Sequence, residues 1–201
     1  FQLVQFILDK CASVSEVTDE LQKFQLIPVI QYLHYLIADQ NGDVLIVEPN
    51  GSGFCFYHSR ETGFPVLSNN KYLSSLKYLT NFKGFGGDLP VLNRKGSNER
   101  FVTAANSLAA FHSQDPLKYS FEMLDSLKQT DTKWSLVYDV KNLTVYFRFH
   151  DCDFEKVFDF KALMQMKSVA GLGGSLTDCK LAGNEGLNRV TEKENARLVQ
   201  K

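Results

Sequence analysis

The sequence predicts an α+β protein in which helices cover antiparallel sheet. Apolar residues recur at helical spacing in some stretches and alternate with polar residues in others. The stretches of each kind are grouped along the chain, and no internal repeat or linker divides it. Groups of strands separated by helices are typical of the α+β class.

Two helices are predicted at the start of the chain. The first carries apolar residues at helical spacing, namely Phe1, Val4, Leu8 and Cys11, with Leu3 and Ile7 beside them. A helix with so much apolar surface needs a partner, so we expect the chain to begin inside or at the edge of a buried helix, as a piece of a longer protein. Ser13 and Glu16 have the spacing of a capping box and predict a second helix. The apolar stripe of this second helix consists of Val14, Val17, Leu21 and Phe24.

A four-stranded antiparallel meander is expected next. Its strands are predicted over residues 32–38, 44–47, 54–58 and 64–69. The turn between the first two strands contains Asn41-Gly42, a dipeptide that tolerates the positive φ of tight hairpins.

The remainder of the chain contains a second group of helices and a second group of strands. Helices are predicted from residue 72, from about residue 98 and from Asp115-Pro116, and strands over residues 135–140, 143–149 and 157–160. We assign residues 1–165 to one domain. Residues 166–201 contain several glycines, become polar, and are expected to form a loosely packed tail.

The composition excludes several classes of protein. The 201 residues include 22 Lys and Arg and 23 Asp and Glu, so the formal net charge is −1. This balance argues against nucleic-acid binding through bulk phosphate attraction and against a polybasic membrane surface. No apolar run approaches the roughly 18 residues of a membrane span. The four cysteines form no C-x-x-C pair, which favours reduced structural thiols and leaves the compartment open, whether cytoplasmic, periplasmic or secreted.

Two clusters of reactive side chains favour structural roles. Cys55 and His58 lie three residues apart on a predicted strand, so they point to opposite faces. Residues 150–153, His-Asp-Cys-Asp, are more typical of a polar strand end than of a metal site, because no second cluster supplies further ligands. The glycine-rich stretches lack the Gly-Lys-Ser/Thr of a phosphate-binding loop. We therefore predict no metal and no cofactor.

Three polar residues are candidates for function. Asn69 and Asn70 end the predicted fourth strand, where asparagine is also common as a turn residue. Arg100 lies in the first turn of a predicted helix, where the macrodipole opposes a cation by a few tenths of a kcal/mol or more. An arginine in this position is either a solvated surface residue or serves another purpose.

Four segments resemble, in order, the choloylglycine hydrolase family, which comprises linear amide C–N hydrolases of the N-terminal-nucleophile superfamily. These segments are residues 33–48, 65–70, 99–105 and 134–148. The likeness extends over about residues 1–165. Ser68 stands where the family usually has threonine, and Lys71 stands where it often has proline.

The resemblance implies an αββα four-layer sandwich with antiparallel sheets, present here as an incomplete C-terminal portion. The nucleophile of the family is a cysteine at the mature N-terminus, and its own α-amine, with a pKa of about 7.7–8.0, serves as the general base. Because the chain begins with Phe1, the resemblance implies that this cysteine lies upstream. This chain alone is therefore expected to be inactive.

The resemblance also implies roles for the three polar residues. Asn69 matches the asparagine whose amide N–H stabilises the oxyanion. Arg100 matches the arginine beside the nucleophile, where a guanidinium favours thiolate over thiol. Asn70 is a candidate substrate-binding residue as the neighbour in the same turn.

The expected reaction is hydrolysis of an N-acyl amide, such as a conjugated bile acid or penicillin V, through a cysteine thioester. Two alternatives stay open: acyl transfer within the same superfamily, and a non-catalytic ligand-binding scaffold. The expected partners are the small-molecule amide and the missing N-terminal portion of the same protein, with no nucleic acid and no membrane span. Assembly into a homo-oligomer is left open.

Overall fold

The computed structural model describes residues 2–24, 33–150, 155–165, 172–173 and 188–189. They belong to two compact units. The first unit comprises residues 1–115 and 125–128, and the second comprises residues 116–124 and 129–201. Among the described residues, none of the helices has the length and apolar character required to cross a bilayer.

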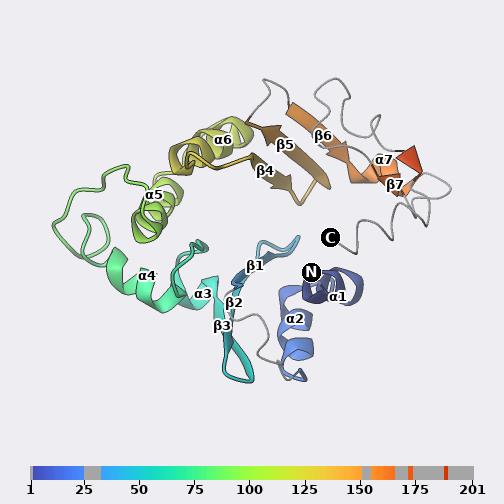
Figure 1. The fold of residues 1–201 in the computed structure, drawn as a ribbon, viewed down its shortest axis with the longest axis horizontal. Helices are drawn as coiled ribbons and strands as arrows, with labels where there is room; N and C mark the ends of the chain where they lie inside the picture. The colour runs from blue at the N-terminus through green and yellow to red at the C-terminus, as the bar shows by residue number, and fades with distance from the viewer. Residues whose placement is uncertain (1, 25–32, 151–154, 166–171, 174–187, 190–201) are drawn as a thin grey trace. The chain divides into compact units, whose positions relative to one another are not determined.

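The first unit is a three-stranded antiparallel sheet with helices (Figure 1). Its elements are α1 (Gln2–Lys10), α2 (Val14–Leu21), β1 (Tyr35–Ala38), β2 (Val44–Asn50), β3 (Gly53–His58), α3 (Ser59–Thr62), α4 (Tyr72–Leu79) and α5 (Ser97–Ala109). The strand order is β1-β2-β3, so β2 is the central strand. The predicted hairpin turn is present, and its Gly42 has a φ of +82°.

Both faces of β2 are buried. Leu45, Ile46 and Val47 are each 0% exposed. Leu45 and Val47 pack with buried residues of α1 and α2, whereas Ile46 packs with buried residues of α4 and α5. Successive side chains on a strand point to opposite faces, so each face of β2 contributes to its own apolar cluster.

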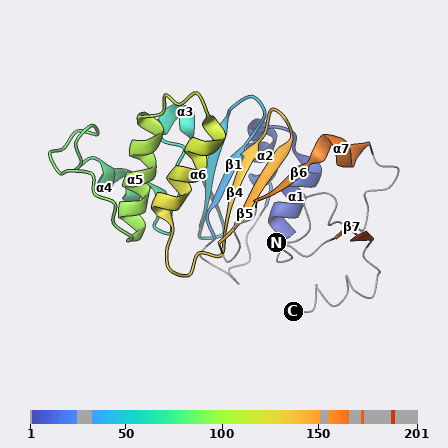
Figure 2. The ribbon, with the colours of Figure 1, turned by 90° about the horizontal axis from the view of Figure 1, so that it is seen from above.

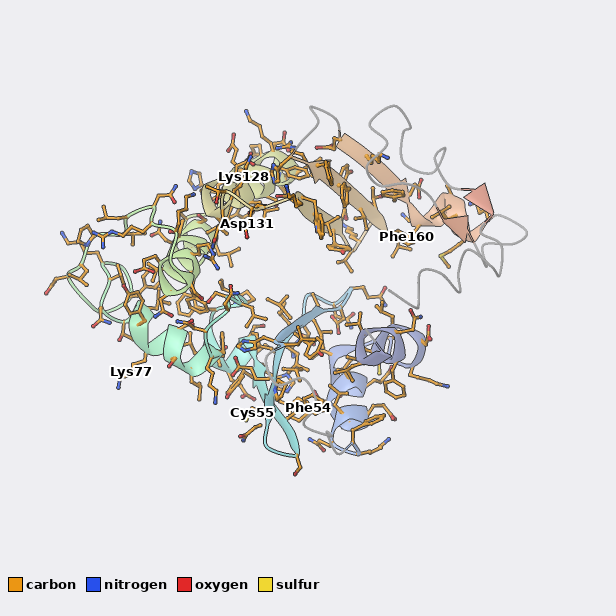
Figure 3. All side chains as sticks on the ribbon, viewed as in Figure 1. Phe54, Cys55, Lys77, Lys128, Asp131 and Phe160 are labelled. Carbon is orange, nitrogen blue, oxygen red and sulfur yellow. The ribbon has the colours of Figure 1, made fainter. Side chains whose placement is uncertain are left out.

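Strand β3 shows the same alternation. Phe54 and Cys55 extend to opposite sides of the strand (Figure 3). Phe54 packs against the cluster that contains α1 and α2, and Tyr57 packs against the cluster that contains α4 and α5. Burial is the main cause that raises the pKa of Tyr57 to about 12, and a hydrogen bond with Cys55 is the second. Cys55 therefore interacts with Tyr57, two residues along the same face.

The predicted fourth strand of the meander is wrong. Residues 64–68 form no strand, and the sheet of the first unit has three strands. The chain instead turns through the short helix α3, which ends at Gly63 with a φ of +81°. Pro65 has no N–H to donate to a neighbouring strand, which disfavours a further strand at this position.

Helix α1 is present, but Val4 and Leu8 of the predicted apolar stripe do not belong to its buried face. Val4 is 44% and Leu8 73% exposed, whereas Ile7 is buried with Leu3 and Phe6 packed beside it. Two apolar stripes compete on this helix, and the one that follows Leu3 and Ile7 faces the cluster around Leu45 and Val47. In the other predicted helix, α2, residues Val14, Val17 and Leu21 are buried as expected, whereas Phe24 lies beyond the helix end and is 41% exposed.

The predicted capping box of α2 is present with one difference. Ser13 Oγ accepts from the Glu16 backbone N–H at 3.3 Å, as expected. Glu16 Oε2 accepts from the N–H of Ala12 at 2.7 Å, one residue before the predicted partner. Asp39 Oδ2 accepts from the N–H of Val14, the first helical residue, at 3.1 Å. The hairpin turn therefore supplies a second carboxylate to the helix N-terminus.

The second unit pairs α6 with another three-stranded antiparallel sheet. Its elements are α6 (Pro116–Leu127), whose last residues belong to the first unit, β4 (Trp134–Asp139), β5 (Thr144–Phe149), β6 (Glu155–Asp159), α7 (Phe160–Met164), β7 (Leu172–Gly173) and β8 (Asn188–Arg189). The order is β4-β5-β6, and Figure 2 shows these strands side by side. The guanidinium carbon of Arg148 on β5 lies 3.9 Å from the centre of the buried Phe121 ring on α6.

The predicted strands of this unit are confirmed, except at three of their end residues: Val140 and Leu143 lie in the turn between β4 and β5, and Phe160 follows β6. This residue begins α7 instead of ending β6, because the Asp159 side chain caps the helix by accepting from the N–H of Ala162 at 3.1 Å. Residues 151–153 of the predicted polar strand end lie outside the described residues. Of the expected tail, the structure describes only the antiparallel pair β7 and β8 beyond residue 165.

Asp39 gives the fold a predicted acid sensitivity. The Val14 N–H and then the backbone N–H groups of Asp43 and Asn41 lower the pKa of Asp39 from its ordinary value of 3.8. Its stabilising effect is present above pH 3.8 and is lost as the pH falls through the lower folded-state pKa. The urea concentration at the midpoint of unfolding should fall between pH 5 and pH 3, and we expect it to fall less in Asp39→Asn than in the unmodified protein. Asp19→Asn, at an exposed position on α2, is the control, and an unchanged drop in Asp39→Asn contradicts the prediction.

Candidate functional site

The candidate site is built on the loop between α3 and α4 (residues 63–71), which contains both predicted asparagines. Tyr72, the first residue of α4, directly follows this loop and contacts its other end. Its hydroxyl donates to the carbonyl oxygen of Phe64 at 2.7 Å, and its backbone N–H donates to Glu48 Oε1 at 2.7 Å. Tyr72 is fully buried, so the loop is held by a residue of the core.

Arg100 determines the orientation of the Asn69 side chain. Arg100 Nη2 donates to Asn69 Oδ1 at 2.7 Å, and Nη1 donates to the carbonyl oxygen of Lys95 at 2.6 Å. A guanidinium has only donors, so Asn69 must present its oxygen to Arg100. The NH2 group of Asn69 is then directed away from Arg100 and is available as a donor. The structure thus brings together two of the three predicted site residues, which are 31 positions apart.

Asn70 is held by the start of α5. Its backbone N–H donates to Ser97 Oγ at 3.1 Å, and its side-chain Nδ2 donates to Asn98 Oδ1 at 2.7 Å. Ser97 Oγ also donates to Ser68 Oγ at 3.2 Å, and Ser75 Oγ donates to Asn98 Oδ1 at 3.4 Å. These contacts connect the loop to the first turn of α5, in which Arg100 also lies.

An open cavity of about 480 Å³ lies beside the loop on the surface of α4. Its lining includes Asn70, Lys71, Lys77, Tyr78 and Asn98. Lys77 extends outward from α4 (Figure 3). Asn70 faces this cavity, whereas the other two predicted site residues are not part of its lining.

Glu48 is a buried carboxylate next to the loop. Its side chain is 8% exposed, and besides the N–H of Tyr72 it meets the His34 imidazole. His34 Nδ1 approaches Glu48 Oε1 at 3.0 Å without the geometry of a hydrogen bond. The carboxylate therefore depends chiefly on the hydrogen bond from α4.

The environment of Cys11 is not that of an activated thiol. Burial raises the pKa of Cys11, and the carboxylates of Glu20 and Glu16 raise it further. A raised pKa lowers the thiolate fraction at neutral pH, and thiolate is the reactive form. Among the described residues, no group of three His, Cys, Asp or Glu side chains could hold a metal ion.

Sequence reasoning missed Ser97, Asn98 and Glu48. Serine and asparagine at the start of a predicted helix are explained by capping alone, so their contacts with the loop gave no separate signal. Glu48 had a signal, because a carboxylate directly following the apolar run 44–47 on a central strand must find a partner.

The fold has counterparts among solved structures. The penicillin V acylase from Agrobacterium tumefaciens superposes with a TM-score of 0.74 at 24% identity, over 93% of this chain and 66% of that chain. Two variants of the conjugated bile acid hydrolase from Clostridium perfringens superpose with TM-scores of 0.57 and 0.56 at 15% and 14% identity, each over 75% of this chain and 58% of the other. This chain thus spans less than two thirds of the length of these relatives, and its fold is that of the N-terminal-nucleophile hydrolases.

The family follows from the sequence. Residues 1–105 match the family model of the linear amide C-N hydrolases, choloylglycine hydrolase family. This match covers more than half of the chain, and the chain belongs to this family. The α+β fold class and the family expected from the sequence are therefore confirmed. No curated protein matches the chain significantly in sequence.

The contact between Ser97 and Asn70 can be tested by hydrogen exchange. We expect Ser97→Ala to increase the exchange rate of the Asn70 amide about five- to tenfold, because a net hydrogen bond contributes about 1 kcal/mol. NMR-detected exchange at that amide is the measurement. Ser74→Ala, at an exposed position on α4, is the control, and equal rates in the two variants would show that Ser97 does not protect Asn70.

Proposed function

We propose that the full-length protein hydrolyses a linear amide C–N bond in an N-acyl amide, with Asn69 and Arg100 in its active site. The substrate would be a conjugated bile acid, penicillin V or a related acyl amine. Family membership supports the reaction class. The solved relatives support the substrate range, since they are a penicillin V acylase and a conjugated bile acid hydrolase.

One observation carries the roles of the two residues. The hydrogen bond from Arg100 Nη2 to Asn69 Oδ1, at 2.7 Å, leaves the Asn69 NH2 group as a donor with a fixed direction. A preorganised N–H stabilises the charge that develops on a carbonyl oxygen, because the donor needs no reorientation during the reaction. Arg100 also brings a positive charge beside that donor, which favours an anionic nucleophile nearby.

The proposed reaction proceeds through a thioester at a cysteine upstream of this chain. The α-amine of that cysteine takes the thiol proton, and the thiolate attacks the amide carbon. The Asn69 NH2 group donates to the resulting oxyanion. The C–N bond then breaks, and the α-ammonium returns the proton to the leaving amine. Water attacks the thioester and releases the carboxylic acid and the free thiol.

We expect Asn69→Ala in the full-length protein to lower kcat about a hundredfold, because loss of one oxyanion donor costs about 3 kcal/mol. The assay is amine release from penicillin V and from a glycine-conjugated bile acid. Asn69 is exposed, so the thermal midpoint should change little. Asn106→Ala, at an exposed position on α5, is the matched control, and an unchanged kcat in Asn69→Ala would remove Asn69 from the mechanism.

The two alternatives predict different products and a different N-terminus. For a hydrolase, we expect the free acid to remain the main product when a primary amine acceptor is added. Formation of a new amide would instead indicate an acyltransferase. N-terminal sequencing of the native protein should find cysteine, and a residue other than cysteine, serine or threonine would favour a non-catalytic scaffold.

A further inference from the structure

Glu48 is a buried carboxylate to which the proposed chemistry assigns no role. Its residue exposure is 6%, and burying an ionised carboxylate is costly unless it is hydrogen-bonded or paired. Position 48 shares the face of β2 with Ile46, which packs with the residues of α4 and α5. The alternation of β2 therefore directs this carboxylate toward α4, and it accepts from the N–H of Tyr72 at 2.7 Å.

Glu48 serves α4 as its N-terminal cap. The residue at the N-cap position, Lys71, makes no side-chain capping hydrogen bond, and the first turn of α4 contains no acidic residue. The first N–H groups of a helix have no partner within the helix, and a negative charge there is favourable. A residue 24 positions earlier thus supplies the acceptor that the local sequence does not.

The capped residue is also the one that fixes the loop of the candidate site. Tyr72 follows Asn69 by three positions, and its hydroxyl holds Phe64 at the other end of the loop. The hydroxyl also lies 2.6 Å from Thr62 Oγ1 in α3. The position of the loop therefore depends on Tyr72, and the backbone of Tyr72 depends on Glu48.

We propose that Glu48 is a positioning residue for Asn69: its buried carboxylate fixes the start of α4 and hence the direction in which Asn69 presents its NH2 group. This inference rests on the proposed function, because it gives Glu48 its effect through the oxyanion donor. Displacement of a reacting group by about 1 Å can cost up to a hundredfold in rate, so an effect of Glu48 on kcat is expected without contact with the substrate.

The test is a double-mutant cycle between Glu48 and Asn69 in the full-length protein, with penicillin V as the assay substrate. We expect Glu48→Ala to lower kcat about tenfold with KM within twofold. In the Asn69→Ala background, the same substitution should lower kcat less than twofold, because the donor that it positions is already absent. Glu48→Gln keeps an acceptor for the Tyr72 N–H and should retain kcat within threefold of the unmodified protein.

Two further variants separate positioning from loss of stability. Val17→Ala, in the apolar cluster of α1 and α2, lowers stability away from the loop and should leave kcat unchanged at a temperature where it is folded. If Glu48→Ala fails to fold, Glu48→Asp takes its place in the cycle, since it keeps the charge and shortens the reach to Tyr72. A normal kcat in the folded Glu48 variant would overturn the proposal and assign the carboxylate a purely structural role.

The cycle also distinguishes failure of the positioning role of Glu48 from failure of the proposed function. Multiplicative losses in the double variant would show that Glu48 acts independently of Asn69, which overturns this inference and leaves the proposed function intact. Full activity in Asn69→Ala alone would overturn the role of Asn69 in the proposed function, and the positioning role of Glu48 with it.

Discussion

The burial of both faces of β2 is the constraint on which the first unit depends. Leu45 and Val47 are buried on one face and Ile46 on the other, so helices must cover both sides of the sheet. The next residue along the strand, Glu48, lies on the face toward α4 and meets the N-terminus of that helix. A shift of β2 by one residue would direct this carboxylate into the cluster formed with α1 and α2, so the polar contact disfavours that shift.

The candidate loop lacks regular secondary structure, so side-chain hydrogen bonds determine its conformation. Tyr72 at the end of the loop donates to Phe64 at its start and to Glu48 on β2, Ser97 accepts from the loop backbone at Asn70, and Arg100 orients Asn69. Tyr72 belongs to α4 and is held by Glu48 of β2, and Ser97 and Arg100 belong to the first turn of α5. Rigid elements thus position a loop residue, which is the arrangement that a preorganised donor requires.

The sequence predicted the helices and hairpins well because their signals are local. Periodicity located α4, α5, β2 and β4, and Ser13 located the start of α2. The fourth strand failed because an apolar run around Pro65 does not show whether a neighbouring strand can accept it. The contact between Asn69 and Arg100 spans 31 positions, and no local pattern encodes it. Turn chemistry and the helix dipole made both residues candidates for function, but only the family resemblance implied particular roles for them.

The position of Arg100 follows from its two acceptors. In the first turns of α5 its charge opposes the helix dipole by a few tenths of a kcal/mol. Its guanidinium offsets this cost by donating at once to the Lys95 carbonyl and to Asn69 Oδ1, at 2.6 and 2.7 Å. The amino group of a lysine would donate from one nitrogen and would not reproduce this planar pair of contacts. Because arginine offers donors alone, it also excludes the flipped orientation of the Asn69 amide, in which two donor groups would face each other.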